Sequence, residues 1–172
     1  MLRAYLRLVL FSFGLLIGVQ APGFVDQYAK RVSAHYIEAT KDFAGFQRSA
    51  DQNFGGSVDA LIAHHQSSTD PVFQGEAHSI ATIYTRLKGL ALELEAMSRS
   101  LPSRIVHVVL YPDKEILHET IAAYSYTVPL NQEAILCGLL VALLLALLVE
   151  FIVLGVMGLG RLSMGSASSS AA

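Results

Sequence analysis

The chain has 172 residues, of which 53% are hydrophobic and 15% are charged, and its formal net charge is −2. Soluble domains usually contain about 25% charged residues, so this composition favours a chain that lies partly in a membrane. The small acidic excess and the lack of a basic patch argue against a nucleic-acid partner, and the single cysteine, Cys137, excludes an intramolecular disulfide and a Cys-pair metal site.

The first apolar segment is predicted to be an N-terminal transmembrane anchor over residues 1–23. Its apolar part is extended if the side chain of Arg7 turns back to the membrane interface. A cleavable signal peptide is the alternative, because Val19–Ala21 resembles a small-residue cleavage site. Pro22 is a poor residue directly after a cut, so an uncleaved anchor is favoured.

The second apolar segment, Ala134–Gly160, predicts another transmembrane helix within residues 131–161. At about 1.5 Å rise per residue, roughly 20 apolar residues cross the hydrocarbon core. Asn131 is the expected N-cap, and Glu150 is the only ionisable residue of the apolar stretch. Residues 162–172 are small and polar, which predicts a disordered tail.

The distribution of basic residues sets the expected orientation. Arg3, Arg7 and Arg161 flank the two spans, whereas residues 22–133 carry nine Lys or Arg and thirteen Asp or Glu. Long loops are translocated largely regardless of their charge, so the short basic ends decide. Both termini are therefore expected to be cytoplasmic, with residues 22–133 on the opposite side.

The segment between the spans, residues 24–130, predicts an antiparallel helical bundle. Pro22-Gly23 is an expected kink or hinge, after which a long helix covers 24–53 and can be nearly continuous with the first span. A second long helix is predicted over 74–100, closed by Pro102. Both helices have apolar residues at helical spacing, close to a coiled-coil seam, and in the second helix the steps of three and four alternate without a break from Ile80 onward. The first stripe comprises Val25, Tyr28, Val32, Tyr36, Ala39, Phe43, Phe46 and Ala50, and the second comprises Phe73, Ile80, Ile83, Leu87, Leu90, Leu94, Met97 and Leu101.

A short helix is predicted between the two long ones. Gly55-Gly56 is expected to end the first long helix, because glycine commonly follows a helix terminus. Ser57 is the expected N-cap of a helix over 58–65. Residues 66–71 have the composition of a loop.

The chain after the second long helix gives weaker signals. Residues 105–111 contain several β-branched residues, but a lone strand is not stable, so a short buried or interfacial helix is favoured there. Pro112-Asp113 is expected to start another helix, which carries Ile116, Leu117 and Tyr124 on one side. A turn is predicted at residues 127–130.

Three residues of the spans are candidate functional positions. Gly14 and Gly18, four residues apart, predict a face on which another helix packs closely. Glu150 is costly in lipid and is a functional hypothesis by default. It can be a protonated or interface-seeking carboxylate with Arg161 or Arg7 nearby, a polar contact to a partner helix, or a proton-linked site.

The sequence contains no recognised catalytic, cofactor-binding or metal-binding motif. The zinc-protease pattern HExxH, the nucleophile elbow GxSxG and the phosphate-binding GxGxxG are all absent. His64-His65 would need Asp59 or His78 to complete a ligand set, and solvated histidines are favoured instead. We therefore expect a non-enzymatic protein with no cofactor and no metal.

Several stretches together resemble a bacterial inner-membrane family, domain of unknown function 2937. The stretches are Pro22–Tyr28, Ala44–Gln47, Phe54–Gly56, Leu61–His65, Asp70–Phe73 and Leu147–Glu150. The resemblance implies a bacterial envelope setting, which would make residues 22–133 periplasmic. It implies no activity, cofactor or site.

The expected fold class is all-α, with two transmembrane helices flanking an extracytoplasmic antiparallel helical bundle. The favoured function is a structural or interaction protein whose partners are the lipid bilayer and either further copies of itself or another membrane protein. One alternative is a periplasmic ligand-sensing subunit that works through a partner protein. Another is an accessory subunit of a transporter that uses Glu150.

Overall fold

The structure, a computed structural model, describes residues 2–126 and 131–167, and side chains within 5–126 and 131–152. In this part of the chain it has six α-helices and no strand, which confirms the all-α expectation. The chain forms two compact units: unit 1 comprises residues 1–24 and 125–172, and unit 2 comprises residues 25–124.

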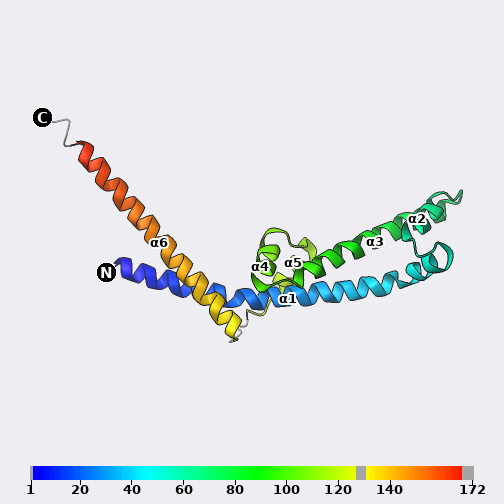
Figure 1. The fold of residues 1–172 in the computed structure, drawn as a ribbon, viewed down its shortest axis with the longest axis horizontal. Helices are drawn as coiled ribbons and strands as arrows, with labels where there is room; N and C mark the ends of the chain where they lie inside the picture. The colour runs from blue at the N-terminus through cyan, green and yellow to red at the C-terminus, as the bar shows by residue number, and fades with distance from the viewer. Residues whose placement is uncertain (1, 127–130, 168–172) are drawn as a thin grey trace. The chain divides into compact units, whose positions relative to one another are not determined.

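The helices are shown in Figure 1, and two of them contribute to unit 1. Helix α1 (Leu2–Asn53) begins in unit 1 and continues into unit 2, and α6 (Gln132–Ala167) belongs to unit 1. Unit 2 contains the rest of α1 and four further helices, which are α2 (Val58–Gln66), α3 (Pro71–Met97), α4 (Leu101–Leu110) and α5 (Lys114–Ala123).

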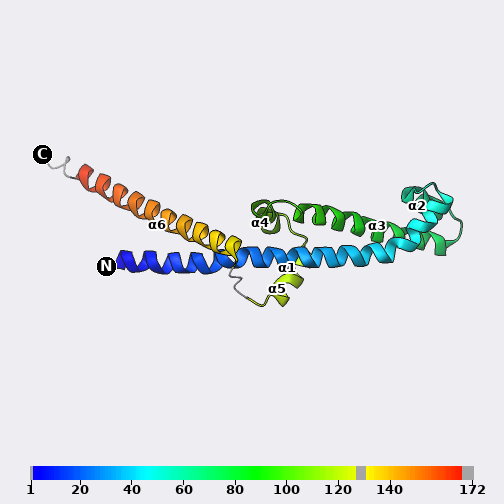
Figure 2. The ribbon, with the colours of Figure 1, turned by 60° about the horizontal axis from the view of Figure 1, so that its bottom comes forward.

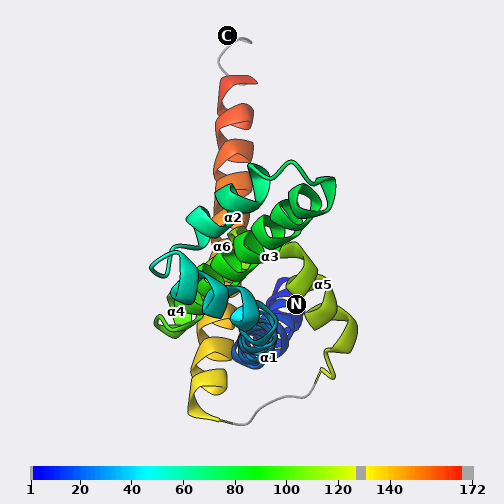
Figure 3. The same cartoon turned by 90° about the vertical axis from the view of Figure 1, so that its right-hand side faces the viewer.

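Within unit 2, α1 and α3 lie side by side, and α2 connects them at one end (Figures 1 and 2). The contacts pair increasing residue numbers in α1 with decreasing numbers in α3. Tyr28 contacts Glu93, and the ring of Phe43 stacks on Tyr84 with centroids 5.2 Å apart. At the other end, α4 and α5 lie on either side of α1 (Figures 2 and 3).

The predicted cap residues explain why these helices begin and end where they do. Gly55 and Gly56 follow α1 with φ of +58° and +85°, a region that glycine enters without steric cost. The Ser57 hydroxyl accepts from the Ala60 N–H at 3.1 Å at the start of α2. The Asn131 carboxamide accepts from the Ala134 N–H at 2.8 Å at the start of α6.

Two prolines begin helices that the sequence analysis placed differently. Helix α3 starts at Pro71, three residues before the predicted start at residue 74, with Asp70 as its N-cap. Helix α3 already ends at Met97, so Pro102 does not close it. Pro102 lies in the first turn of α4, which starts at Leu101 and covers most of the ambiguous segment 105–111 as a helix. Proline fits the first helical turn because its missing N–H would have no intrahelical partner there.

Helix α1 is more regular than expected, and α6 extends further than expected. Helix α1 runs without interruption through Pro22, where a kink or hinge was predicted. Helix α6 continues to Ala167, so residues 162–167 are helical rather than part of a disordered tail. Residues 168–172 of that tail and the predicted turn at 127–130 lie outside the described residues.

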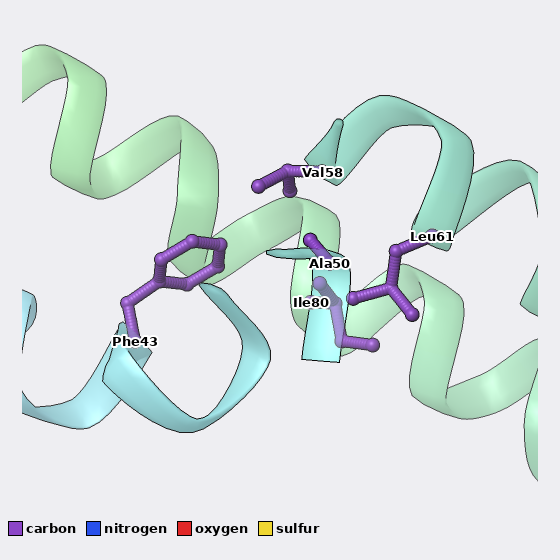
Figure 4. Close-up of a cluster of buried hydrophobic side chains, with 5 residues drawn as sticks. All are labelled: Phe43, Ala50, Val58, Leu61 and Ile80. Atoms are coloured by element: carbon purple, nitrogen blue, oxygen red, sulfur yellow. The ribbon is translucent and has the colours of Figure 1, made fainter. Parts of the chain in front are cut away.

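The core of unit 2 joins α1, α2 and α3 through the predicted apolar stripes. A cluster of five buried side chains, drawn in Figure 4, comprises Phe43, Ala50, Val58, Leu61 and Ile80. Tyr28 and Val32 of the first stripe are fully buried, whereas Phe73 of the second stripe is 45% exposed. The periodicity therefore identified the buried faces correctly except at the start of α3.

Replacing Gly45 or Gly89 with Ala is expected to stabilise unit 2. Both glycines are exposed within helices, and a Cβ added at either would have no neighbour within 4 Å. Alanine has a higher helix propensity than glycine, so we expect a gain of about 0.5–1 kcal/mol at each site. Thermal unfolding followed by circular dichroism measures it. Gly55→Ala is the control and should destabilise, because its φ is +58°.

Candidate functional site

Small residues bring α1 and α6 close together in unit 1. A Cβ added at Gly18 would lie 2.8 Å from the Cα of Gly138, and one added at Gly14 would lie 3.0 Å from the Cα of Ala142. Ala134 and Ala142 are both 0% exposed. The structure thus places Gly14 and Gly18 against a matching row of small residues spaced four apart on α6, which allows close backbone approach.

Many large apolar side chains of unit 1 are exposed and lie outside this contact. On α6 they include Leu136, Leu144 and Phe151, which are 58%, 57% and 74% exposed. Within the residues whose side chains are described, two helical segments are long and apolar enough to cross a membrane. They are Tyr5–Asn53, through its apolar first part, and Gln132–Ile152, with hydropathies of 2.0 and 2.9. Their strongly apolar outer surfaces are what lipid-facing helices require.

Glu150 forms an ion pair with Arg7. The two residues belong to α6 and α1, so the pair joins both helices of unit 1 beyond the small-residue contact. An ionised carboxylate in lipid is costly unless it is paired. Of the two arginines considered as neighbours of Glu150, the structure selects Arg7, and the side chain of Arg161 is outside the described set.

A buried polar network connects four elements of unit 2. The Tyr28 hydroxyl on α1 donates to Oε1 of Glu93 on α3. The same carboxylate oxygen is 3.0 Å from Nε2 of His107 on α4. The Tyr28 oxygen also accepts from the backbone N–H of Asp113, the N-cap of α5, at 2.9 Å.

Burial determines the chemistry of this network. Tyr28 is 0% exposed, and the side chain of Glu93 is 12% exposed. Burial raises the pKa of Tyr28 above its ordinary value, and the hydrogen bond to Glu93 raises it further. Tyr28 therefore stays neutral and donates to a carboxylate, an arrangement that fixes helices rather than one that activates a nucleophile.

A second polar cluster attaches α5 to α1 and α3. Oε2 of Glu119 on α5 is 2.9 Å from Nε2 of His35 and 3.5 Å from the guanidinium of Arg31, both on α1. Arg86 on α3 approaches Glu115 on α5 at 3.5 Å. The hydrogen bond from His35 lowers the pKa of Glu119, which outweighs the opposing effect of desolvation, and the charges of His35 and Arg31 lower it further.

Acidification should weaken this attachment, and Glu119→Gln should remove part of the pH dependence. Because the folded-state pKa of Glu119 is below its ordinary value of 4.5, its contribution to stability is complete above that value. The contribution is lost as pH falls through the lowered folded-state pKa. The unfolding temperature, measured between neutral pH and pH 3, should therefore decrease more steeply with falling pH for the wild-type chain than for Glu119→Gln. Equal slopes would contradict the expectation.

A cavity of about 380 Å³ lies beside this cluster, between α1 and α3. Its lining is mixed in charge and consists of His35, Glu38, Ala39, Asp42, Thr82, Ile83 and Arg86. A lining of this kind suits a small polar molecule that carries both charges.

The remaining histidines are not brought together as a ligand set. The His64 ring packs on Phe54 with centroids 5.3 Å apart, and the edge of the His65 ring meets Phe73 at 5.5 Å. Neither Asp59 nor His78 joins them. Among the described residues, no group of three His, Cys, Asp or Glu side chains could hold a metal ion.

Sequence reasoning missed three residues that take part in these helix contacts. Gly138 could have been recognised as part of a packing face, because Ala134 and Ala142 flank it at a spacing of four. Glu93 and Glu119 lie off the apolar stripes, and their partners are 65 and 84 residues away in sequence. No local pattern could have identified these two carboxylates.

Comparison with known proteins identifies a family. The model of a family described as "Protein of unknown function (DUF2937)" matches residues 2–161. No curated protein and no solved structure matches the chain.

Proposed function

The chain belongs to the DUF2937 family, whose description assigns no activity, and we propose that it is a two-span bacterial inner-membrane protein with a non-enzymatic interaction role. In this proposal unit 1 is the membrane anchor, with both termini in the cytoplasm. Unit 2 is a periplasmic antiparallel helical bundle that packs against a partner membrane protein or a second copy.

The outward-facing apolar surface of unit 1 carries the proposal. Only 11% of the most apolar window of α6 is buried, although its hydropathy is 2.9. A helix of a soluble domain would bury such a surface, whereas lipid accepts it without a partner. The small-residue contact and the Arg7–Glu150 pair support a fixed pair of spans rather than two independent anchors.

Unit 2 supports a structural role because its polar groups join helices to each other. The Tyr28–Glu93–His107 network and the Glu119 cluster both connect elements that are distant in sequence. The descending order of α1–α3 contacts supports an antiparallel arrangement. The basic residues Arg3, Arg7 and Arg161 at the ends of the spans favour cytoplasmic termini.

Membrane extraction and a topology reporter test the placement. We expect the chain to remain in the membrane after a carbonate wash, and a reporter inserted beside His65 to be active only on the periplasmic side. A reporter at the C-terminus is the matched control and should be active in the cytoplasm. A soluble chain after the wash, or a cytosolic reporter at His65, would overturn the topology.

Crosslinking in native membranes tests the interaction role. Crosslinked species resolved by mass should contain a second copy or a defined partner protein. A chain that stays monomeric and without a partner, while passing the topology test, would contradict the role and leave the topology intact.

A ligand-sensing subunit is the second candidate, favoured by the mixed-charge cavity between α1 and α3. Thermal unfolding of the full chain in lipid nanodiscs should then shift with one member of a panel of small zwitterionic and ionic metabolites. Arg86→Ala, which removes the cationic side of the cavity, should abolish the shift. If no member of the panel shifts the unfolding temperature, the ligand-sensing role is rejected and only the structural role remains.

A further inference from the structure

The outer face of α4 differs in composition from the rest of unit 2. Its exposed residues are all apolar, namely Pro102, Val106, Val109 and Leu110. Val109 and Leu110 are 71% and 61% exposed, and Tyr111, directly after the helix, is 72% exposed. Each of the other helices of unit 2 has exposed charged residues, such as Lys41 on α1, Asp59 on α2, Glu95 on α3 and Lys114 on α5.

The inner face of α4 already has its partners. Val108 is 5% exposed, and His107 reaches Glu93 of α3. Turning the helix to bury its outer face would break these contacts. The exposed apolar surface is therefore held outward by the same polar network that fixes α4 to α3, and it needs an occupant from outside unit 2.

The position of α4 in the chain identifies that occupant. The network holding α4 includes Tyr28, which lies within the first helical turn of unit 2 on the continuous helix α1. Asp113, just after α4, donates its N–H to the same tyrosine. Unit 2 returns to unit 1 after Tyr124. Thus α4 is anchored at the end of unit 2 where the chain arrives from one proposed span and leaves for the other.

We propose that the outer face of α4 lies on the membrane surface, with Val106, Val109 and Leu110 inserted at the level of the lipid headgroups. This rests on the proposal that unit 1 spans the bilayer. An amphipathic helix in such a position buries its apolar side about 5–10 Å into the boundary between headgroups and acyl chains. Tyr111 at the edge of the face is the residue type enriched at this depth.

Lipid contact can be measured with single-cysteine probes in the full chain. In a Cys137→Ser background, Val109→Cys carries an environment-sensitive fluorophore, and single copies are reconstituted into phosphatidylcholine–phosphatidylglycerol nanodiscs. We expect a blue-shifted emission and strong quenching when the phosphatidylcholine chains are brominated. Gln52→Cys, an exposed site at the far end of α1, should emit as in water and remain unquenched. Circular dichroism checks that each labelled variant keeps the wild-type helix content.

A third probe separates this proposal from the one on which it rests. Leu144→Cys, on the outer face of α6 and 57% exposed, should be quenched if α6 spans the bilayer. Quenching at Leu144 with a water-like, unquenched signal at Val109 overturns the α4 proposal alone. A blue shift at Val109 without quenching by brominated lipid also overturns it, in favour of a protein contact. Loss of quenching at Leu144 overturns the membrane anchor.

Discussion

Replacing Gly18 with Leu is expected to separate α1 from α6 in unit 1. A Cβ at this position would lie 2.8 Å from the Cα of Gly138 and 2.9 Å from the carbonyl oxygen of Cys137. Overpacking costs about 1–3 kcal/mol where neighbouring side chains can move, and more where they cannot. Because these neighbours are backbone atoms, the helices can relieve the overlap only by moving apart. Gly45→Leu in the same helix is the matched control, since a Cβ there meets nothing within 4 Å.

A crosslinking trap measures this separation directly. In a Cys137→Ser background, Arg7→Cys and Glu150→Cys replace the ion pair that joins α1 and α6, and a short bifunctional thiol reagent links the two thiols while the helices lie side by side. A protease site inserted in the loop at residues 67–70 cuts the chain, and the two fragments stay together only if the crosslink has formed. We expect linked fragments in the parent and with Gly45→Leu, and separated fragments with Gly18→Leu. Linked fragments in all three would contradict the importance of this contact.

The same contact illustrates what the sequence could predict. Gly14 and Gly18 indicated a packing face by their spacing, but a spacing does not identify the opposite helix. Gly138, in the middle of a strongly apolar stretch, was read as part of the span rather than as part of a face. Packing in lipid depends on where side chains are small, whereas hydropathy reports only that they are apolar.

The predicted helix boundaries in unit 2 were wrong at the prolines for a physical reason. Proline ends a helix that precedes it and also fits the first turn of one that follows. Pro102 was interpreted in the first sense only, so the start of α4 at Leu101 was missed. By contrast, Ser57 and Asn131 were identified correctly as N-caps, because their side chains act on the nearest backbone N–H groups.

The polar networks of unit 2 could not be predicted, because they depend on tertiary contacts. Tyr28 was assigned to the core by its place in the apolar stripe, and it is buried as expected. Its hydroxyl, however, is satisfied by Glu93 and by the backbone of Asp113, residues that the stripe does not relate to it. A buried tyrosine needs a partner for its hydroxyl, but sequence spacing does not say which residue provides it.

Removing the Tyr28 side chain should be the most destabilising change in unit 2. Tyr28→Phe keeps the ring but leaves the Asp113 N–H without its acceptor and removes a donor from Glu93. Leaving a buried polar group unsatisfied costs about 1–3 kcal/mol. Tyr28→Ala also creates a cavity, for which truncation of a large aromatic typically costs about 3–5 kcal/mol. Urea unfolding of the full chain in nanodiscs, followed by circular dichroism, measures both losses.

A matched tyrosine and a double-mutant cycle decide whether the hydroxyl acts through the network. Tyr111→Phe removes a hydroxyl from a residue that is 72% exposed, so its effect should stay within about 0.5 kcal/mol. Glu93→Gln weakens the same network from α3, and groups in direct contact should be non-additive by about 0.5–3 kcal/mol. If Tyr28→Phe behaves like Tyr111→Phe, or if its effect adds fully to that of Glu93→Gln, the network does not fix α3, α4 and α5 to α1. In that case apolar packing alone must fix α4 to unit 2 and keep its apolar face exposed.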